Sequence, residues 1–151
     1  GCGTGLFGSK IKPYCKILHG IDLSNEMLDA ARQKSIYDNL EHTDILTYLE
    51  KIPQRYDFFV ATDVFIYLGD LDNIFNLIKK NNSKGGHLLF STEHLKSGDY
   101  KLETTARYSH SKEYIEKLCA KYDYELKYFE LTDLRKETTG YIKGAIYILS
   151  F

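Results

Sequence analysis

Short apolar runs alternate along this chain with segments in which apolar residues recur every three or four positions. The first pattern is typical of strands in a sheet, and the second is typical of helices that bury one face. The predicted strands cover residues 16–22, 40–44, 57–63, 87–93, 124–131 and 145–151, and the predicted helices cover residues 25–34, 45–51, 70–80 and 111–122. Ser24 and Ser111 stand where helix N-caps are expected. Residues 81–86 are rich in turn-forming types and predict a loop.

The order of these segments predicts an α/β fold. Strands that alternate with helices favour a mainly parallel sheet with helices on both faces, which is a three-layer αβα sandwich. The run at residues 57–63 is almost wholly apolar, as expected for a strand buried on both faces. The last two strands are joined by about a dozen residues without a helical pattern, so we expect them to pair antiparallel.

Length and composition restrict the classes of function. The 151 residues suffice for one domain, so we assign residues 1–151 to a single domain. The 20 basic and 21 acidic side chains give a formal net charge of −1, whereas a nucleic-acid binder usually carries a basic surplus. The sequence shows neither a membrane-spanning apolar run nor a signal-peptide pattern, so we expect no membrane partner and no nucleic acid. Cys2, Cys15 and Cys119 have no metal-ligand spacing, which favours free thiols in a reducing cytoplasm and no metal site.

The glycine-rich start is the strongest local signal for a ligand site. Gly1, Gly3 and Gly5 alternate with two other small or polar residues, and a helical segment follows them. Glycines let the backbone approach a ligand closely, and a turn that leads into a helix directs backbone N–H groups at that ligand. A plain tight turn is the other interpretation, and three glycines in five residues make it the less favoured one.

Three aspartates end successive predicted strands, at the sheet edge where open α/β proteins bind ligands. Asp22 follows the glycines at the end of the next strand, where a carboxylate can accept hydrogen bonds from ribose hydroxyls. Asp44 can accept from an adenine amino group or cap the helix that starts at Ile45, and the sequence leaves both roles open. Asp63 ends the following strand and faces the same edge.

These residues together resemble the motifs of class I (Rossmann-like) methyltransferases that depend on S-adenosylmethionine (SAM). The resemblance is carried by Gly1-Cys2-Gly3-Thr4-Gly5-Leu6-Phe7-Gly8, Gly20-Ile21-Asp22-Leu23-Ser24, Asp63-Val64-Phe65-Ile66-Tyr67 and Gly85-Gly86-His87-Leu88-Leu89. Within that family the chain is similar to the methyltransferase-11/12-like group associated with TPR repeats. The segment Tyr108-Ser109-His110-Ser111 also resembles that group. The resemblance covers essentially the whole chain.

The resemblance implies a seven-stranded sheet with an antiparallel last strand, and it implies SAM as the cofactor. The cofactor-binding residues that it implies are Gly1, Gly3, Gly5, Asp22, Leu23, Met27, Asp44, Ile45 and Asp63. The glycines would approach the methionine part of SAM and Asp22 would hold the ribose. Met27 and Asp44 would lie around the adenine, and Asp63 beside the methionine end. The family has a further central strand before the glycines, so we expect an N-terminally incomplete domain with a gap beside the strand that ends at Asp22.

Methyl transfer from a sulfonium is an in-line displacement that depends on alignment and on the exclusion of water. An acceptor that must lose a proton needs a base, and His110 is the candidate because histidine titrates near neutral pH. It lies in residues 93–111, which in this fold overhang the pocket, and a loop or cap role is its other interpretation. Tyr67 could present an aromatic face to the sulfonium or serve as a weaker base candidate, or it could pack in the core.

The sequence favours a small-molecule acceptor. A protein acceptor, and a SAM-binding fold that acts as a scaffold or sensor without catalysis, stay open as alternatives. Gly3-Thr4-Gly5-Leu6-Phe7-Gly8 also fits the dinucleotide pattern G-x-G-x-x-G, so an NAD-dependent oxidoreductase is a remote alternative. The earlier start of the glycine run and the two antiparallel strands at the end fit a methyltransferase better.

Overall fold

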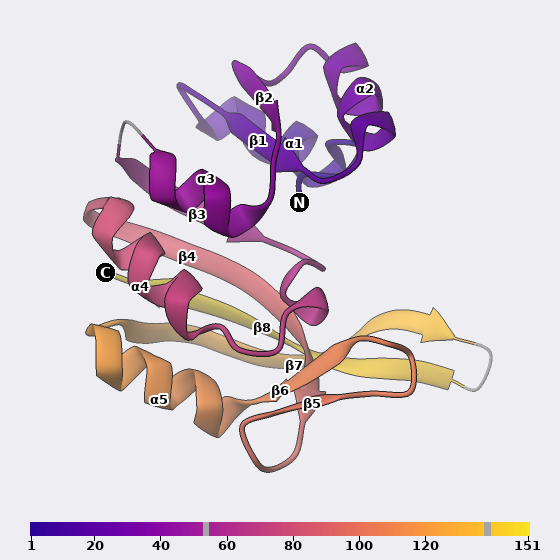
Figure 1. The fold of residues 1–151 in the computed structure, drawn as a ribbon, viewed down its shortest axis with the longest axis vertical. Coiled ribbons are helices and arrows are strands. Elements are labelled where there is room, and N and C mark those ends of the chain that lie inside the picture. Colours follow the sequence, from indigo (N-terminus) through magenta and orange to yellow (C-terminus); the bar gives the residue numbers. More distant parts are fainter. Residues whose placement is uncertain (53–54, 138–139) are drawn as a thin grey trace. The chain divides into compact units, whose positions relative to one another are not determined.

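Strands and helices alternate over most of the chain, as the sequence predicts (Figure 1). The computed structural model describes residues 1–52, 55–137 and 140–151. These residues fall into two units, Gly1–Lys51 and Ile52–Phe151. Each unit has its own sheet.

The first unit carries the glycine-rich start and a small parallel sheet. Its elements in chain order are α1 (Leu6–Ile11), the 3-10 helix η1 (Lys12–Tyr14), β1 (His19–Asp22), α2 (Asn25–Gln33), β2 (Asn39–His42) and α3 (Ile45–Lys51). β1 pairs in parallel with β2, and Asp22 lies opposite His42 in this ladder. The Ser24 hydroxyl accepts a hydrogen bond from the N–H of Met27 at 3.2 Å, which confirms the predicted N-cap of α2.

The second unit is built around the long strand β4. Its elements in chain order are β3 (Tyr56–Ala61), the 3-10 helix η2 (Phe65–Tyr67), α4 (Asp72–Asn81), β4 (Asn82–Leu95), β5 (Tyr100–Leu102), β6 (Tyr108–Ser111), α5 (Lys112–Tyr122), β7 (Glu125–Glu137) and β8 (Gly140–Ser150). The strand order is β5-β6-β4-β8-β7, and β3 also pairs with β4. β3 and β6 run parallel to β4, whereas β8 runs antiparallel to both β4 and β7. The predicted antiparallel pairing of the last two strands is therefore confirmed.

An aromatic core joins the helices of the second unit to its sheet. Phe90 of β4 is fully buried and stacks on Tyr147 of β8, with ring centroids 4.9 Å apart. Phe75 of α4 meets the Phe90 ring edge-on at 5.8 Å, and Phe65 of η2 lies 5.1 Å from it. Burial of such large rings is a main source of the favourable free energy of folding. The predicted mixed α/β, Rossmann-like class is confirmed.

Two expectations about this sheet are wrong. Residues 81–86 are not a plain loop, because β4 starts at Asn82. Tyr56 pairs with Asn82 and Phe58 already pairs with His87, so β4 bulges out between these two pairs. This bulge accommodates the turn-forming residues inside the strand. Nor is β3 buried on both faces: 65% of Phe58 and 38% of Val60 are exposed, and these two residues lie on the same face of the strand.

Two further expectations need correction. The resemblance implied one seven-stranded sheet, whereas the described residues form a two-stranded and a six-stranded sheet. The sequence pattern placed no strand between residues 93 and 111, whereas this stretch contains the end of β4 and the hairpin of β5 and β6. β6 pairs with β4 through Glu93, His94 and Leu95 and thus extends the sheet. Short strands such as β5 carry too few residues to show a period of two.

Candidate functional site

The glycine-rich turn and the end of β1 form one hydrogen-bonded constellation. The N–H of Gly3 donates to Asp22 Oδ2 at 2.7 Å, and the N–H of Ser24 donates to Asp22 Oδ1 at 3.0 Å. The N–H of Cys2 donates to the carbonyl of Ile21 at 2.7 Å. A carboxylate that accepts from two backbone N–H groups is fixed in position. The structure therefore brings together the glycine-rich turn and Asp22, the carboxylate that we expect to bind the ribose.

Two glycines of the turn have left-handed backbone geometry. Gly3 has φ +52° and Gly5, the N-cap of α1, has φ +79°. Residues with a Cβ rarely adopt such angles, which explains glycine at both positions. A Cβ placed on Gly3 would have no other atom within 4 Å, so the backbone of the turn is uncovered there. An uncovered glycine next to a fixed carboxylate is suited to a ligand that approaches the backbone.

The segment after β1 presents two apolar side chains. Leu23 is 71% exposed and Met27 is 43% exposed. His42 at the end of β2 fixes the backbone of this segment, because its Nε2 lies 2.8 Å from the carbonyl oxygen of Leu23. Exposed apolar residues at a fixed backbone can cover one face of a planar ring.

Asp44 caps α3. Of the two roles that the sequence left open, helix cap and acceptor for an adenine amino group, the structure shows the first. Its Oδ1 accepts from the N–H of Thr47 at 2.9 Å. The hydrogen bonds with Thr47 hold the pKa of this carboxyl below its ordinary value. Ile45 is the first residue of α3 and follows directly. The predicted contact of Asp44 and Ile45 with an adenine stays a prediction.

The remaining predicted residues belong to the second unit. Asp63 comes two residues after β3 and has φ +61°, an unusual angle for a residue with a side chain. Its N–H donates to the Ser91 hydroxyl at 2.8 Å. Tyr67 of η2 is 59% exposed, and the Arg107 guanidinium lies 5.9 Å from its ring centre. The backbone strain at Asp63 is the kind that collects at functional sites.

His110 is fully buried in β6, directly before Ser111, the N-cap of α5, so it does not lie in a loop. Its Nε2 lies 2.9 Å from the carbonyl oxygen of Gly69, and its Nδ1 is buried without a hydrogen-bond partner among the described residues. Burial lowers the pKa of this imidazole from its ordinary value, which favours the neutral form. A neutral ring that donates from Nε2 to Gly69 has its free lone pair on Nδ1. The catalytic roles of His110 and Tyr67 stay predictions.

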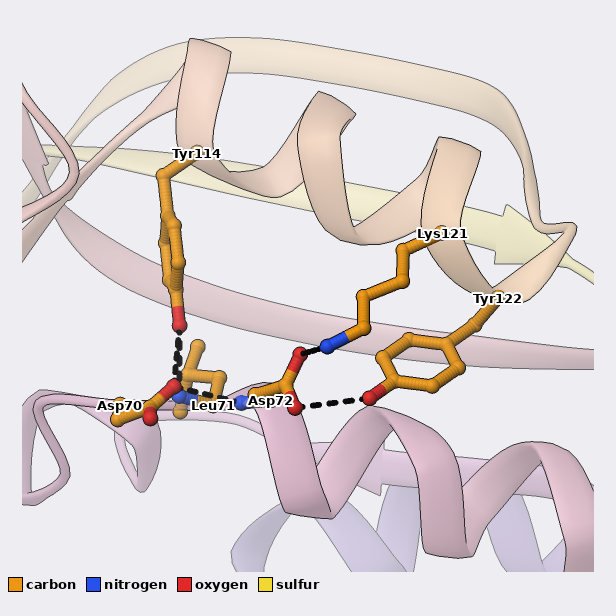
Figure 2. Close-up of polar contacts among 6 residues, drawn as sticks. All are labelled: Asp70, Leu71, Asp72, Tyr114, Lys121 and Tyr122. Carbon is orange, nitrogen blue, oxygen red and sulfur yellow. Dashed lines mark hydrogen bonds and ion pairs between the residues drawn. The ribbon is translucent and has the colours of Figure 1, made fainter.

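Tyr114 of α5 fixes the segment that follows η2, a role that the sequence did not reveal. The Tyr114 hydroxyl donates to Asp70 Oδ1 and accepts from the N–H of Leu71, both at 2.8 Å (Figure 2). Asp70 Oδ1 also accepts from the N–H of Asp72 at 2.9 Å. In the sequence Tyr114 is one of the apolar positions of a predicted helix. The pattern therefore predicts that Tyr114 is buried, but not which groups its hydroxyl contacts.

A second set of contacts ties the start of α4 to the end of α5. Asp72 Oδ1 lies 2.6 Å from Lys121 Nζ, and Asp72 Oδ2 accepts from the Tyr122 hydroxyl at 2.8 Å (Figure 2). Asp72 also stands in the first turn of α4, where a negative charge is favoured by the helix dipole. These contacts hold the two helices together beside the segment fixed by Tyr114.

The family follows from a comparison with known proteins. A family model described as a methyltransferase domain, Methyltransf_12, matches residues 1–88, which include the glycine turn, Asp22, Asp44 and Asp63. The chain belongs to this methyltransferase domain family. The match covers more than half of the chain and so decides between a methyltransferase fold and the dinucleotide pattern.

Similar proteins and structures agree with this membership. The chain is 28% identical over 109 residues to an uncharacterized methyltransferase of Schizosaccharomyces pombe, covering 65% of this chain and 38% of that protein. It is 29% identical over 96 residues to the ubiquinone biosynthesis O-methyltransferase of Proteus mirabilis, covering 61% of this chain and 39% of that protein. The chain thus spans about two fifths of the length of these relatives.

Solved structures share the fold. The N-methyltransferase NodS of Bradyrhizobium japonicum, in complex with S-adenosylhomocysteine (SAH), superimposes with a TM-score of 0.75 at 19% identity. That similarity covers 99% of this chain and 74% of the NodS chain. It identifies the architecture as the Rossmann-like methyltransferase fold.

Two further findings concern the chain as a whole. Cys2, Cys15 and Cys119 are free thiols. Over the part of the chain that the structure describes, no helix has the length and apolar character needed to cross a membrane, and no group of three or more His, Cys, Asp and Glu side chains could hold a metal ion.

Proposed function

We propose that this chain binds SAM through its glycine-rich turn and Asp22 and transfers the SAM methyl group to a small-molecule acceptor. The observation that carries the proposal is the hydrogen bond from the Gly3 N–H to the Asp22 carboxylate, which joins the two motifs at 2.7 Å. Membership of the methyltransferase domain family agrees with it.

The residues of the first unit fit the polar half of such a cofactor. A carboxylate offers about four acceptor positions, and Asp22 uses two of them for the N–H groups of Gly3 and Ser24. The other positions can accept from two ribose hydroxyls. The uncovered backbone at Gly3 leaves room for the amino-acid part of the cofactor, with Gly1 and Gly5 on either side.

The apolar half of the cofactor is an adenine ring. The exposed side chains of Leu23 and Met27 would cover one face of that ring, and Ile45 would contribute at its edge. Asp44 Oδ1 caps α3, so Oδ2 would accept from the adenine amino group. The role that the resemblance implies for Asp63, beside the methionine end, stays a prediction.

When bound, SAM supplies a methyl group on a positively charged sulfur. The chain would hold the acceptor in line with that methyl group and keep water out. The exposed ring of Tyr67 can face a cation. For an acceptor that must lose a proton, the Nδ1 lone pair of His110 would take it, which requires this buried ring, packed against Tyr100 and Tyr114, to become accessible.

A small-molecule acceptor is favoured by the relatives, among them an O-methyltransferase named for ubiquinone biosynthesis. A protein acceptor, or a SAM-binding scaffold without catalysis, is the alternative. We also infer a place in the TPR-associated group, which the sequence of residues 108–111 resembles, a cytoplasmic location, and a single domain over residues 1–151.

The test is calorimetric titration of the full chain with SAH, with NAD in parallel, repeated on Asp22→Asn and on the control Asp29→Asn. Asp29 lies on α2 of the same unit with 68% of its side chain exposed, so the control removes a carboxylate outside the constellation. We expect SAH to bind the wild type and the control alike. Asp22→Asn should bind SAH about 10- to 100-fold more weakly, as loss of a charged acceptor predicts.

The outcomes separate the candidate functions. Binding of NAD in place of SAH would contradict the proposal and support an oxidoreductase. Binding of SAH without methyl transfer to any small-molecule or protein pool would support the scaffold. Equal SAH affinity in Asp22→Asn and wild type would remove Asp22 from the site.

A further inference from the structure

The ring of Tyr37 lies directly beneath the glycine-rich start. A Cβ placed on Gly5 would come within 3.0 Å of the Tyr37 ring, and one placed on Gly20 within 2.9 Å. A Cβ on Gly8 would overlap the Tyr37 hydroxyl and lie 2.6 Å from Cζ. Three glycines from α1 and β1 thus make room for one aromatic side chain.

Hydrogen bonds fix the backbone next to Tyr37 and so define the position from which its side chain extends. The N–H of Asp38 donates to the carbonyl of Leu18 at 2.8 Å. Asp38 Oδ2 in turn accepts from the N–H of Leu18 and from Lys12 Nζ, both at 2.7 Å. Ser35, with φ +52°, ends the turn after α2 and directs the chain toward this anchor.

The Tyr37 hydroxyl reaches the first residues of the turn. Burial, with a smaller contribution from the nearby Cys2 thiol, raises the pKa of Tyr37 to about 12. The phenol is therefore neutral in the physiological range. Cys2 stands between Gly1 and Gly3, two of the glycines expected to approach the cofactor.

We propose that Tyr37 is a positioning residue for the glycine-rich turn. Its ring fills the space left by Gly5, Gly8 and Gly20. It thereby holds the turn in the geometry in which the Gly3 N–H donates to Asp22. This inference rests on the proposed function, since it assumes that the turn binds SAM. It also accounts for Gly8 and Gly20, which the proposed function leaves unexplained. At Gly8 the place of a side chain is occupied by Tyr37, and at Gly20 it is occupied by Leu40 and Tyr37 together.

The test compares SAH affinity, measured by calorimetry on the full chain, among Tyr37→Ala, Tyr37→Phe and Tyr14→Ala. Tyr14 is the matched control, because it lies in the same unit and is 90% exposed. We expect Tyr37→Ala to lower the SAH affinity by about tenfold or more. Tyr37→Phe keeps the ring and should restore most of the affinity, and Tyr14→Ala should match the wild type.

A double-mutant cycle with Gly8→Ala distinguishes a positioning role from a general contribution to folding. With Tyr37 present, the new Cβ overlaps the phenol, so Gly8→Ala should weaken SAH binding by about tenfold. In the Tyr37→Ala background the space is free, and the same substitution should have little further effect. If Tyr37→Ala does not fold, Gly8→Ala alone decides, and unchanged affinity in that variant overturns the inference.

The two proposals fail in different ways. A wild-type chain that does not bind SAH overturns the proposed function and this inference with it. A wild-type chain that binds SAH, with Tyr37→Ala folded by circular dichroism and equal in affinity, overturns the inference alone.

Discussion

Different kinds of interaction stabilise the inside of each of the two units. In the first, the turn that carries Gly3 is fixed by backbone hydrogen bonds to Asp22 and Ile21 and by left-handed glycines. In the second, large aromatic rings around Phe90 are fully buried and stacked. The contrast shows that the glycine-rich turn and the larger sheet are stabilised by different interactions in separate parts of the chain. Substitutions in the two regions should therefore affect different measurements.

The largest expected effect comes from the second unit. Phe90→Ala removes a fully buried ring that contacts Phe65, Phe75 and Tyr147, and should lower the free energy of unfolding by about 3–5 kcal/mol. Chemical denaturation measures this loss. The folded fraction should still bind SAH with wild-type affinity. Loss of affinity by folded Phe90→Ala would break the division between the two regions.

Two helix caps sharpen the comparison at a smaller scale. Ser111 is buried, accepts from the N–H of Tyr114 at 3.0 Å and also donates to the carbonyl of Gly98. Ser24 is only half-buried and caps α2. Ser24→Ala should cost about 1 kcal/mol of unfolding free energy, and Ser111→Ala about 2 kcal/mol, since the buried Ser111 hydroxyl makes two hydrogen bonds. Equal costs would show that burial does not separate the two caps.

The smallest expected effect is a dependence on pH. Burial lowers the pKa of His110 in the folded chain below its ordinary value of 6.5, so the unfolded chain binds the proton more readily. The stabilising contribution of the neutral ring is full above pH 6.5 and should be lost as pH falls below it, by at most about 1.4 kcal/mol per pH unit. Denaturation between pH 7.5 and pH 5, roughly spanning this range, would measure the slope. The slope should be shallower in His110→Asn, and an unchanged slope would contradict the assignment to His110.

Much of the fold could be predicted from the sequence. The helical periodicity and the capping serines place α2, α3, α4 and α5 to within a few residues, because both signals are local. β1 ends at Asp22, as expected. The glycines and Asp22 were predicted as parts of one site, and the structure brings them into hydrogen-bond contact.

Other features could not be predicted, because they depend on partners far away in the chain. The bulge in β4 after Asn82 is set by its pairing with β3, and the hairpin of β5 and β6 is set by pairing with the end of β4. The burial of His110 follows from that hairpin. A histidine in a polar-looking segment carries no local sign that its ring will be enclosed.

The sequence by itself determined the α/β order, the helix caps, and the residue types of the turn and its acid, since these follow from backbone geometry and from contacts between near neighbours. Only the tertiary structure decided that Tyr37 lies beneath Gly5, Gly8 and Gly20, and that the Tyr114 hydroxyl meets Leu71. A side chain's spacing predicts which face of an element it occupies. The atom that it finally contacts is set by packing between elements that the chain brings together only on folding.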